Sequence, residues 1–177
     1  SPENLAKVIK THPNYYRSLD SSLQQIPLMK DQIRESLTNL KVLYPEAIFP
    51  PVYFVVGALN SGGMSSSAGL VIGADMYGLT KDTQMDEMDD WLKTVVAPVS
   101  ALPHIVAHEL IHYQQQYDGG TLLEACLKEG SADFFAELIS GKHINHHVHE
   151  FANPRERELW LEFKAKMNEK GLYGLAL

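Results

Sequence analysis

His108-Glu109-Leu110-Ile111-His112 is the stretch that decides the fold and the site, because it places two imidazoles on one helical face. Residues four apart lie about one turn apart on the same side of an α-helix, so both rings can bind one metal ion. The glutamate that follows the first histidine lies beside such an ion and can take a proton from water. The stretch therefore predicts a metal-binding helix that carries its own base.

The sequence on either side of this motif favours a helix. Ser100 is a suitable N-cap, and Pro103 falls in the first turn, where a missing N–H costs little. Asp118-Gly119-Gly120 is expected to end the helix. The apolar side is expected to consist of Leu102, Ile105, Val106 and Leu110. The alternative is an ordinary core helix whose two histidines are hydrogen-bonded to their neighbours.

Residues 121–140 predict a second helix, and its spacing from the first selects a third metal ligand. A tight Gly-Gly turn favours antiparallel neighbours. Because both helices rise about 1.5 Å per residue, positions equidistant from the turn face each other. Glu129 then lies level with the two histidines, as the third protein ligand of a tetrahedral zinc. The apolar side is expected to consist of Leu122, Leu123, Cys126, Leu127, Phe134, Phe135 and Leu138.

The same spacing sorts the other acidic residues of this second helix. Glu124 falls too near the turn and Glu137 falls beyond the start of the motif, so both are expected to be solvated. Asp133, one turn past Glu129, is placed to accept the free N–H of His108 and so to fix that ring. The alternative for all of them is an ordinary charged helix face.

The two motifs, His108-Glu109-x-x-His112 and Glu129-Gly130-Ser131-Ala132-Asp133, together resemble the gluzincin group of zinc metallopeptidases. The resemblance implies Zn²⁺-ligand roles for His108, His112 and Glu129, the general-base role for Glu109, and a bracing role for Asp133. It covers mainly residues 50–140. Sixteen residues separate His112 from Glu129, fewer than in the best-known peptidases, and no familiar downstream histidine or tyrosine motif is present.

The second motif, together with Leu59-Asn60-Ser61-Gly62-Gly63, is also similar to a bacterial group of predicted zinc-dependent proteases. Those proteins are often lipoproteins related to the gliding-motility type. This resemblance implies an extracytoplasmic location: the periplasm, the envelope as a lipoprotein, or the exterior. It also implies a peptide or protein substrate.

The expected reaction is zinc-dependent hydrolysis of a peptide bond, in which Glu109 takes a proton from water and passes it to the leaving amine. Two alternatives stay open. One is a catalytically inactive zincin-like binding or assembly protein of the bacterial envelope. The other is a zinc hydrolase that acts on a non-peptide amide.

Several further side chains are candidates for lining the cleft or for stabilising the oxyanion of the tetrahedral intermediate. They are Tyr77, His104, Tyr113, Tyr117, His143 and His146. His143 and His146 belong to a histidine-rich stretch that also contains His147 and His149. Spacing does not choose among these residues, and a solvated or scaffold position is the alternative for each of them.

The rest of the chain predicts an α+β, helix-rich fold with a small, mainly antiparallel sheet over the two site helices. Residues 1–44 are expected to be helical. Residues 52–58 and 68–74 are β-branched and aromatic, so Asn60-Ser61-Gly62-Gly63 between them predicts a β-hairpin. Residues 69–74 would then offer an edge for an extended substrate. The glycine-rich loop could close over that substrate or let a backbone approach it closely, or it has no role.

Two further helices are expected as scaffold. Thr83 is a candidate cap for a helix that reaches Val96, and Asn153 for one that Gly171 ends. The residues expected to face inward are Met85, Met88, Trp91 and Leu92 in the first helix, and Leu159, Trp160, Phe163 and Met167 in the second.

Composition limits the remaining functions. At 177 residues the chain is expected to be one domain, and its net charge of −7 argues against nucleic-acid binding. A single cysteine, Cys126, excludes an internal disulfide, and its apolar neighbours predict burial. No apolar run approaches the roughly 20 residues of a membrane span. The start at Ser1-Pro2 and the apolar ending over residues 171–177 leave open a longer natural chain, and the sequence does not fix the oligomeric state.

Overall fold

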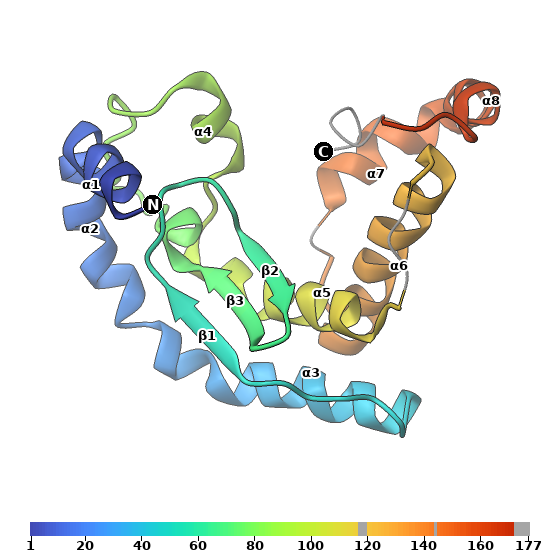
Figure 1. Cartoon of the computed structure of the whole chain (residues 1–177), viewed down its shortest axis with the longest axis horizontal. Coiled ribbons are helices and arrows are strands. Elements are labelled where there is room, and N and C mark those ends of the chain that lie inside the picture. Colours follow the sequence, from blue (N-terminus) through green and yellow to red (C-terminus); the bar gives the residue numbers. More distant parts are fainter. Residues whose placement is uncertain (117–119, 144, 172–177) are drawn as a thin grey trace.

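The computed structural model describes residues 1–116, 120–143 and 145–171. In this part of the chain, helices surround a three-stranded sheet, which confirms the expected helix-rich α+β fold (Figure 1). The predicted Asp118-Gly119 turn, Tyr117 and the apolar ending from residue 172 onward lie outside the described residues.

The N-terminal quarter of the chain is helical, as predicted. It consists of α1 (Pro2–Thr11), α2 (Pro13–Leu23), the short 3-10 helix η1 (Ile26–Met29) and α3 (Lys30–Leu43). The Ser1 side chain accepts from the Asn4 N–H and caps α1, whereas Pro13 opens α2 at a position that needs no N–H donor. Figure 1 shows α1 and α2 on one side of the sheet and α3 running below it.

The sheet has the strand order β1-β3-β2, with β1 (Val52–Val55), β2 (Gly63–Ser66) and β3 (Gly69–Gly73). β1 runs parallel to β3, and β2 runs antiparallel to it, so the sheet is mixed rather than mainly antiparallel. Helix α5 (Leu102–Gln114) contacts β2 and β3.

The predicted pairing of residues 52–58 with residues 68–74 as a hairpin is wrong. These two segments are parallel, and the hairpin is formed by β2 and β3. β3 is apolar and largely buried on both faces, so it takes the central position with a neighbour on each side. Residues 69–74 therefore do not supply an edge, and β2 is the edge strand beside α5.

The two site helices, α5 and α6 (Leu122–Ser140), are antiparallel neighbours. Ser100 does not cap α5; it lies in the 3-10 helix η3 (Val99–Ala101), and Pro103 stands in the first turn of α5, as predicted. Helix α6 begins with a reciprocal capping box between Thr121 and Glu124, and Gly141 ends it at a φ of 68°, where a residue without a side chain is favoured.

Alanines form most of the face of α6 that packs on the rest of the protein. Ala125, Ala132, Ala136 and Ile139 are buried there. Most of the large residues that were predicted to be buried are exposed. The exposed fraction of the residue is 41% to 63% for Leu127, Phe134, Phe135 and Leu138, and Cys126 is exposed as well. Small side chains let two helix backbones approach closely, which explains why the larger residues lie on the opposite side.

The two predicted scaffold helices also differ from expectation. Helix α4 is shorter (Asp90–Val95) and is capped by Asp89, and Trp91 is 54% exposed although Met88 and Leu92 are buried. After α7 (His146–Ala152) and the 3-10 helix η4 (Asn153–Arg155), α8 (Glu156–Lys166) has no buried residue over its described length.

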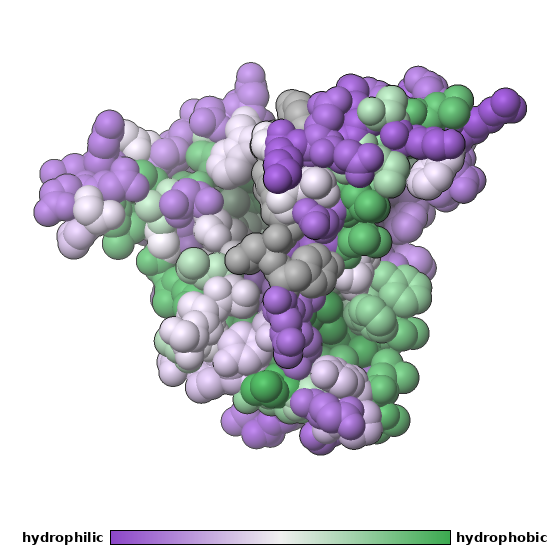
Figure 2. Space-filling model, turned by 45° about the vertical axis from the view of Figure 1, so that its right-hand side comes forward, coloured by the Kyte–Doolittle hydropathy of each residue, from purple (hydrophilic) through white to green (hydrophobic). Residues whose placement is uncertain are grey.

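Trp160 of α8 is 57% exposed, and Figure 2, which brings the α6–α8 side forward, shows hydrophobic residues gathered over part of this surface. Among the described helices, none is both long enough and apolar enough to cross a bilayer.

Candidate metal centre

Three potential ligand atoms from α5 and α6 meet in a small triangle. Nε2 of His108 lies 2.9 Å from Nε2 of His112, and these two atoms lie 3.5 Å and 3.2 Å, respectively, from Oε2 of Glu129. A tetrahedral zinc with bonds of roughly 2.0–2.1 Å requires its ligand atoms to be about 3.3 Å apart. The three predicted ligands therefore fit one zinc ion without rearrangement.

The outer nitrogens of both rings are held by oxygen atoms that only accept hydrogen bonds. Nδ1 of His108 lies 2.8 Å from Oδ1 of Asp133, and Nδ1 of His112 lies 2.7 Å from Oε1 of Gln115. The Gln115 amide nitrogen donates to the Lys128 carbonyl and to Ser131, which fixes the orientation of that amide. Each Nδ1 therefore carries the hydrogen of a neutral ring, and each Nε2 lone pair is free.

Two free imidazole lone pairs and a carboxylate oxygen thus converge with no hydrogen between them when both rings are neutral. Such a triangle is repulsive unless a cation or a proton is placed inside it. Burial by itself would lower the pKa of His108, but the hydrogen bonds with Asp133 and Glu129 outweigh it and raise the pKa to about 9. Hydrogen bonds from His108 and His112 hold the pKa of Glu129 below its usual range. These two shifts show that the group favours a positive charge at the point where a metal ion would bind.

Glu109, the predicted base, lies buried beside this triangle and does not belong to it. Burial raises the pKa of its carboxyl group, against the opposing effect of His108 and His112. A Cβ added to Gly63 would lie 2.5 Å from Oε1 of Glu109. Gly63 therefore lets the backbone at the start of β2 pack directly on the carboxylate.

The triangle and Glu109 open into a cavity of about 660 Å³. Its walls come from residues 60–65, from α5 and from α6, and they also include Tyr77, Gln115 and Lys128. The volume lies within the roughly 300–1,000 Å³ typical of ligand pockets. One wall is the edge strand β2, so an extended chain placed there would lie next to the candidate metal centre.

A buried carboxylate that the sequence analysis did not single out holds the segment leading into β2. Asp75 is 1% exposed and accepts from the Gly57 N–H at 2.8 Å and the Leu59 N–H at 2.7 Å. Tyr16 donates its hydroxyl hydrogen to the Gly57 carbonyl. No local pattern indicates these contacts, because they join segments that are far apart in the sequence.

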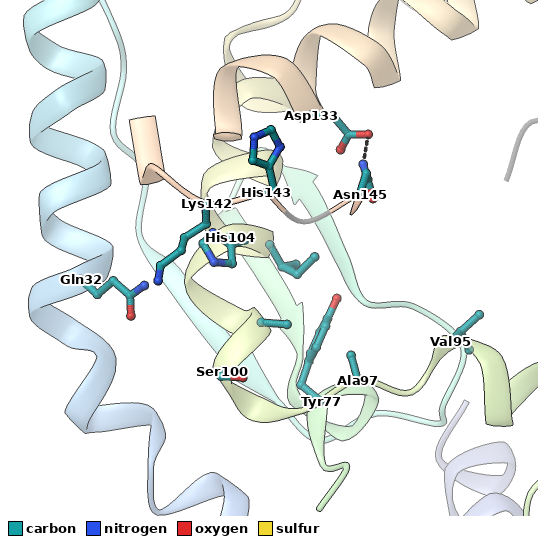
Figure 3. A pocket seen from close by; sticks show the side chains of 12 residues that line it. Gln32, Tyr77, Val95, Ala97, Ser100, His104, Asp133, Lys142, His143 and Asn145 are labelled. Atoms are coloured by element: carbon teal, nitrogen blue, oxygen red, sulfur yellow. Dashed lines mark hydrogen bonds between the residues drawn. The ribbon is translucent and has the colours of Figure 1, made fainter. Parts of the chain in front are cut away.

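The candidates for the cleft fall into three groups. Tyr77 lines the cavity of the metal centre, whereas His104 and His143 line a neighbouring cavity of about 630 Å³ that Tyr77 also borders (Figure 3). Tyr113 packs against a hydrophobic cluster, and His146 pairs with Glu150 on the surface. The structure thus brings only Tyr77, among these described candidates, to the wall around Glu109.

Two supporting residues were missed in the sequence. Gln115 orients His112, and its position three residues after that histidine was the available signal. Asn145 donates its amide hydrogen to Oδ2 of Asp133, as Figure 3 shows, and thereby holds the carboxylate that orients His108. Asn145 belongs to the histidine-rich stretch, where nothing in the spacing distinguishes it.

The fold and the site define an α+β domain with a candidate metal centre between two antiparallel helices. A family model described as gliding motility protein GldB matches residues 2–164, which is most of the chain. The chain therefore belongs to the GldB family of gliding-motility lipoproteins, and the predicted relation to such lipoproteins is confirmed. No curated protein and no solved structure matches the chain. Membership of this family is consistent with the expected location in the bacterial envelope.

Proposed function

We propose that the chain is a zinc-dependent metallopeptidase of the gluzincin type, which hydrolyses peptide bonds in an extended peptide or protein. The observation that supports this most directly is the triangle of His108, His112 and Glu129. Its ligand atoms lie 2.9–3.5 Å apart, and both outer ring nitrogens are already committed to other partners. Two imidazoles and one carboxylate are a common ligand set of catalytic zinc, which keeps a fourth position open.

Zinc held by these three residues would polarise the scissile carbonyl and lower the pKa of water towards neutrality. The protein's own contribution to the reaction is proton transfer by Glu109. Its carboxylate takes the proton from the attacking water and hands it to the leaving amine, so that the C–N bond can break. Because burial raises the pKa of Glu109, its carboxylate is a better proton acceptor than an exposed one.

The edge strand β2 supports a peptide as the substrate. Residues 63–66 pair with β3, and residues 63–65 of this strand also line the cavity. An extended peptide can add to such an edge through main-chain hydrogen bonds, which gives affinity without requiring a particular sequence. The cavity wall also carries Lys128, a positive charge that can attract a carbonyl or carboxylate group of the substrate.

The test is the variant Glu109→Gln in zinc-loaded protein, with a panel of internally quenched peptides and an unfolded protein as substrates. We expect the wild type to cleave some of these substrates and the variant to be slower by about 10²–10⁴-fold, with unchanged zinc affinity. Glu162→Gln, at an exposed position of α8, is the matched control and should retain full activity. Undiminished hydrolysis by Glu109→Gln would contradict the assignment.

A different result would favour the alternative function. If the wild type binds zinc at this centre and cleaves none of the substrates, a zincin-like binding or assembly protein of the envelope becomes the better interpretation. If the wild type binds no zinc at the centre of His108, His112 and Glu129, both the peptidase and the zincin-like alternative fail.

A further inference from the structure

A second group of metal-ligand side chains lies outside the centre described above. It consists of Glu137 near the end of α6, His143 just after α6, and His149 on α7. Each of the three offers one ligand atom, and these atoms all lie within 4.8 Å of one another. The group shares no residue with the triangle of His108, His112 and Glu129.

The distances are close to those of a metal site. Nδ1 of His143 already lies 3.0 Å from Oε2 of Glu137, and the rings of His143 and His149 are nearly perpendicular, with their centroids 6.1 Å apart. Ligand atoms around a tetrahedral zinc are about 3.3 Å apart. The side chain of His143 is 76% exposed, so a small rotation can close the remaining gap without disturbing the core.

The carboxylate of Glu137 is only partly paired by the surrounding protein. Its side chain is only 17% exposed, and Oε1 is buried with no hydrogen-bond partner among the described residues. Within the same part of the chain, no lysine or arginine forms an ion pair with it, and Lys142 points towards Gln32 of α3 (Figure 3). An ion pair with His143 alone engages one carboxylate oxygen and leaves the other without a partner.

We propose that Glu137, His143 and His149 bind a second zinc ion. Two imidazoles and one carboxylate suit zinc, because it is a borderline ion that accepts nitrogen and oxygen ligands, and water completes its coordination. This ion joins the end of α6 to α7. The site is independent of catalysis, so its presence does not rest on the proposed peptidase activity.

The segment that the second ion anchors also supports the first centre. Asn145 lies between His143 and α7 and donates a hydrogen bond to Asp133, which orients His108. Glu137 and Asp133 are one helical turn apart on α6. The second zinc therefore has a structural role: it holds the residues after α6 in the position that keeps Asn145 against Asp133.

The experiment is a count of zinc ions per chain in tag-free protein, by elemental analysis after equilibration with micromolar free zinc and by calorimetric titration of the metal-free protein. We expect two ions in the wild type. The double variant His143→Ala with His149→Ala should bind one ion, and so should His108→Ala with His112→Ala. The matched control, His146→Ala with His147→Ala, removes two neighbouring exposed histidines outside the group and should still bind two.

The variant Glu137→Gln should also lose the second zinc ion, and it keeps the size of the side chain. Circular dichroism verifies that each variant is folded, and folding is expected because His143 and His149 are on the surface. Amide hydrogen exchange in α7 should slow on zinc addition in the wild type and in the variant that lacks His108 and His112. If the variant without His143 and His149 binds as many ions as the wild type, the proposal is overturned, whatever the count at the first centre.

Discussion

Oδ1 of Asp133 lies 2.8 Å from Nδ1 of His108, so a carboxylate on α6 fixes the ring of a candidate zinc ligand on α5. The other ring has a neutral partner, since Oε1 of Gln115 lies 2.7 Å from Nδ1 of His112. A carboxylate that accepts the ring hydrogen makes the imidazole a stronger metal ligand than a neutral amide does. The two rings are therefore held by groups of different charge. Removal of the charged group, Asp133, and removal of the neutral group, Gln115, should change the zinc affinity to different extents.

Replacement of Asp133 by Ala should weaken zinc binding at the centre by about 10- to 100-fold, because His108 loses both its orientation and its charged partner. Replacement of Gln115 by Ala should weaken it less. Calorimetric titration of the metal-free variants with zinc measures both effects. Asp31→Ala, at a side chain that is 98% exposed, is the control. An unchanged zinc affinity in the Asp133 variant would show that the brace is unimportant.

The arrangement of the candidate metal centre was predictable because the regular geometry of two helices relates its residues. Along α5, His104, His108 and His112 contact Ser140, Asp133 and Glu129 of α6 in reverse order, which is the register of an antiparallel pair. Equal rise per residue from a common turn is enough to place Glu129 opposite the histidines. The capping box between Thr121 and Glu124 was not predicted, although it depends only on residues three apart.

Features that depend on contacts between distant segments were not predictable. The strand pattern indicates that residues 52–58 and 68–74 form strands, but the parallel pairing depends on residues 56–62 passing to the far side of β3. Large hydrophobic residues on α6 were expected inside, although its buried face consists mainly of small residues such as Ala132 and Ala136. The contacts of Asp75 and Asn145 likewise join segments that no local pattern relates.

The metal-free protein should lose stability as the pH rises. The pKa of His108 is raised from 6.5 to about 9 in the folded protein, so the stabilisation is complete below pH 6.5 and is lost as the pH rises through about 9. The loss in the free energy of unfolding should be on the order of 3 kcal/mol. Urea unfolding in the presence of a chelator, at pH values on either side of this interval, measures it.

Two comparisons isolate the contribution of His108. The variant His108→Ala should lack most of the decrease in stability between these pH values. Zinc-loaded protein should not show the decrease either, because the ion takes the place of the proton. A decrease of the same size in the variant would assign the effect to other groups.

Replacement of Gly63 by Ala should reduce turnover and leave zinc binding intact. The new Cβ would lie 2.5 Å from Oε1 of Glu109, and the backbone of Gly63 is held by pairing with Ile72. The carboxylate of Glu109 must therefore move, and a displacement of about 1 Å of a reacting group can cost on the order of 10²-fold in rate. Peptide cleavage and zinc titration of the same preparation separate the two effects.

The matched control for the Gly63→Ala variant is a substitution at another glycine, Gly130→Ala. It lies on α6 next to Glu129, and a Cβ there would meet nothing within 4 Å. Activity should be retained, and the free energy of unfolding should rise by about 0.5–1 kcal/mol, because alanine is favoured over glycine within a helix. Equal activity of the Gly63 and Gly130 variants would refute the proposed contact between Gly63 and the base.

Replacement of Tyr77 by Phe should lower kcat by about 10²–10³-fold, with little change in zinc affinity. Tyr77 is 7% exposed and lines the cavity that contains Glu109 and His108. Burial, followed by the charge of Glu109, raises the pKa of its hydroxyl, so the group keeps its hydrogen and can donate it to an oxyanion. Tyr113→Phe is the control, because Tyr113 packs against a hydrophobic cluster and lies outside the lining of that cavity. If the two phenylalanine variants have the same kcat as the wild type, the oxyanion donor is another group.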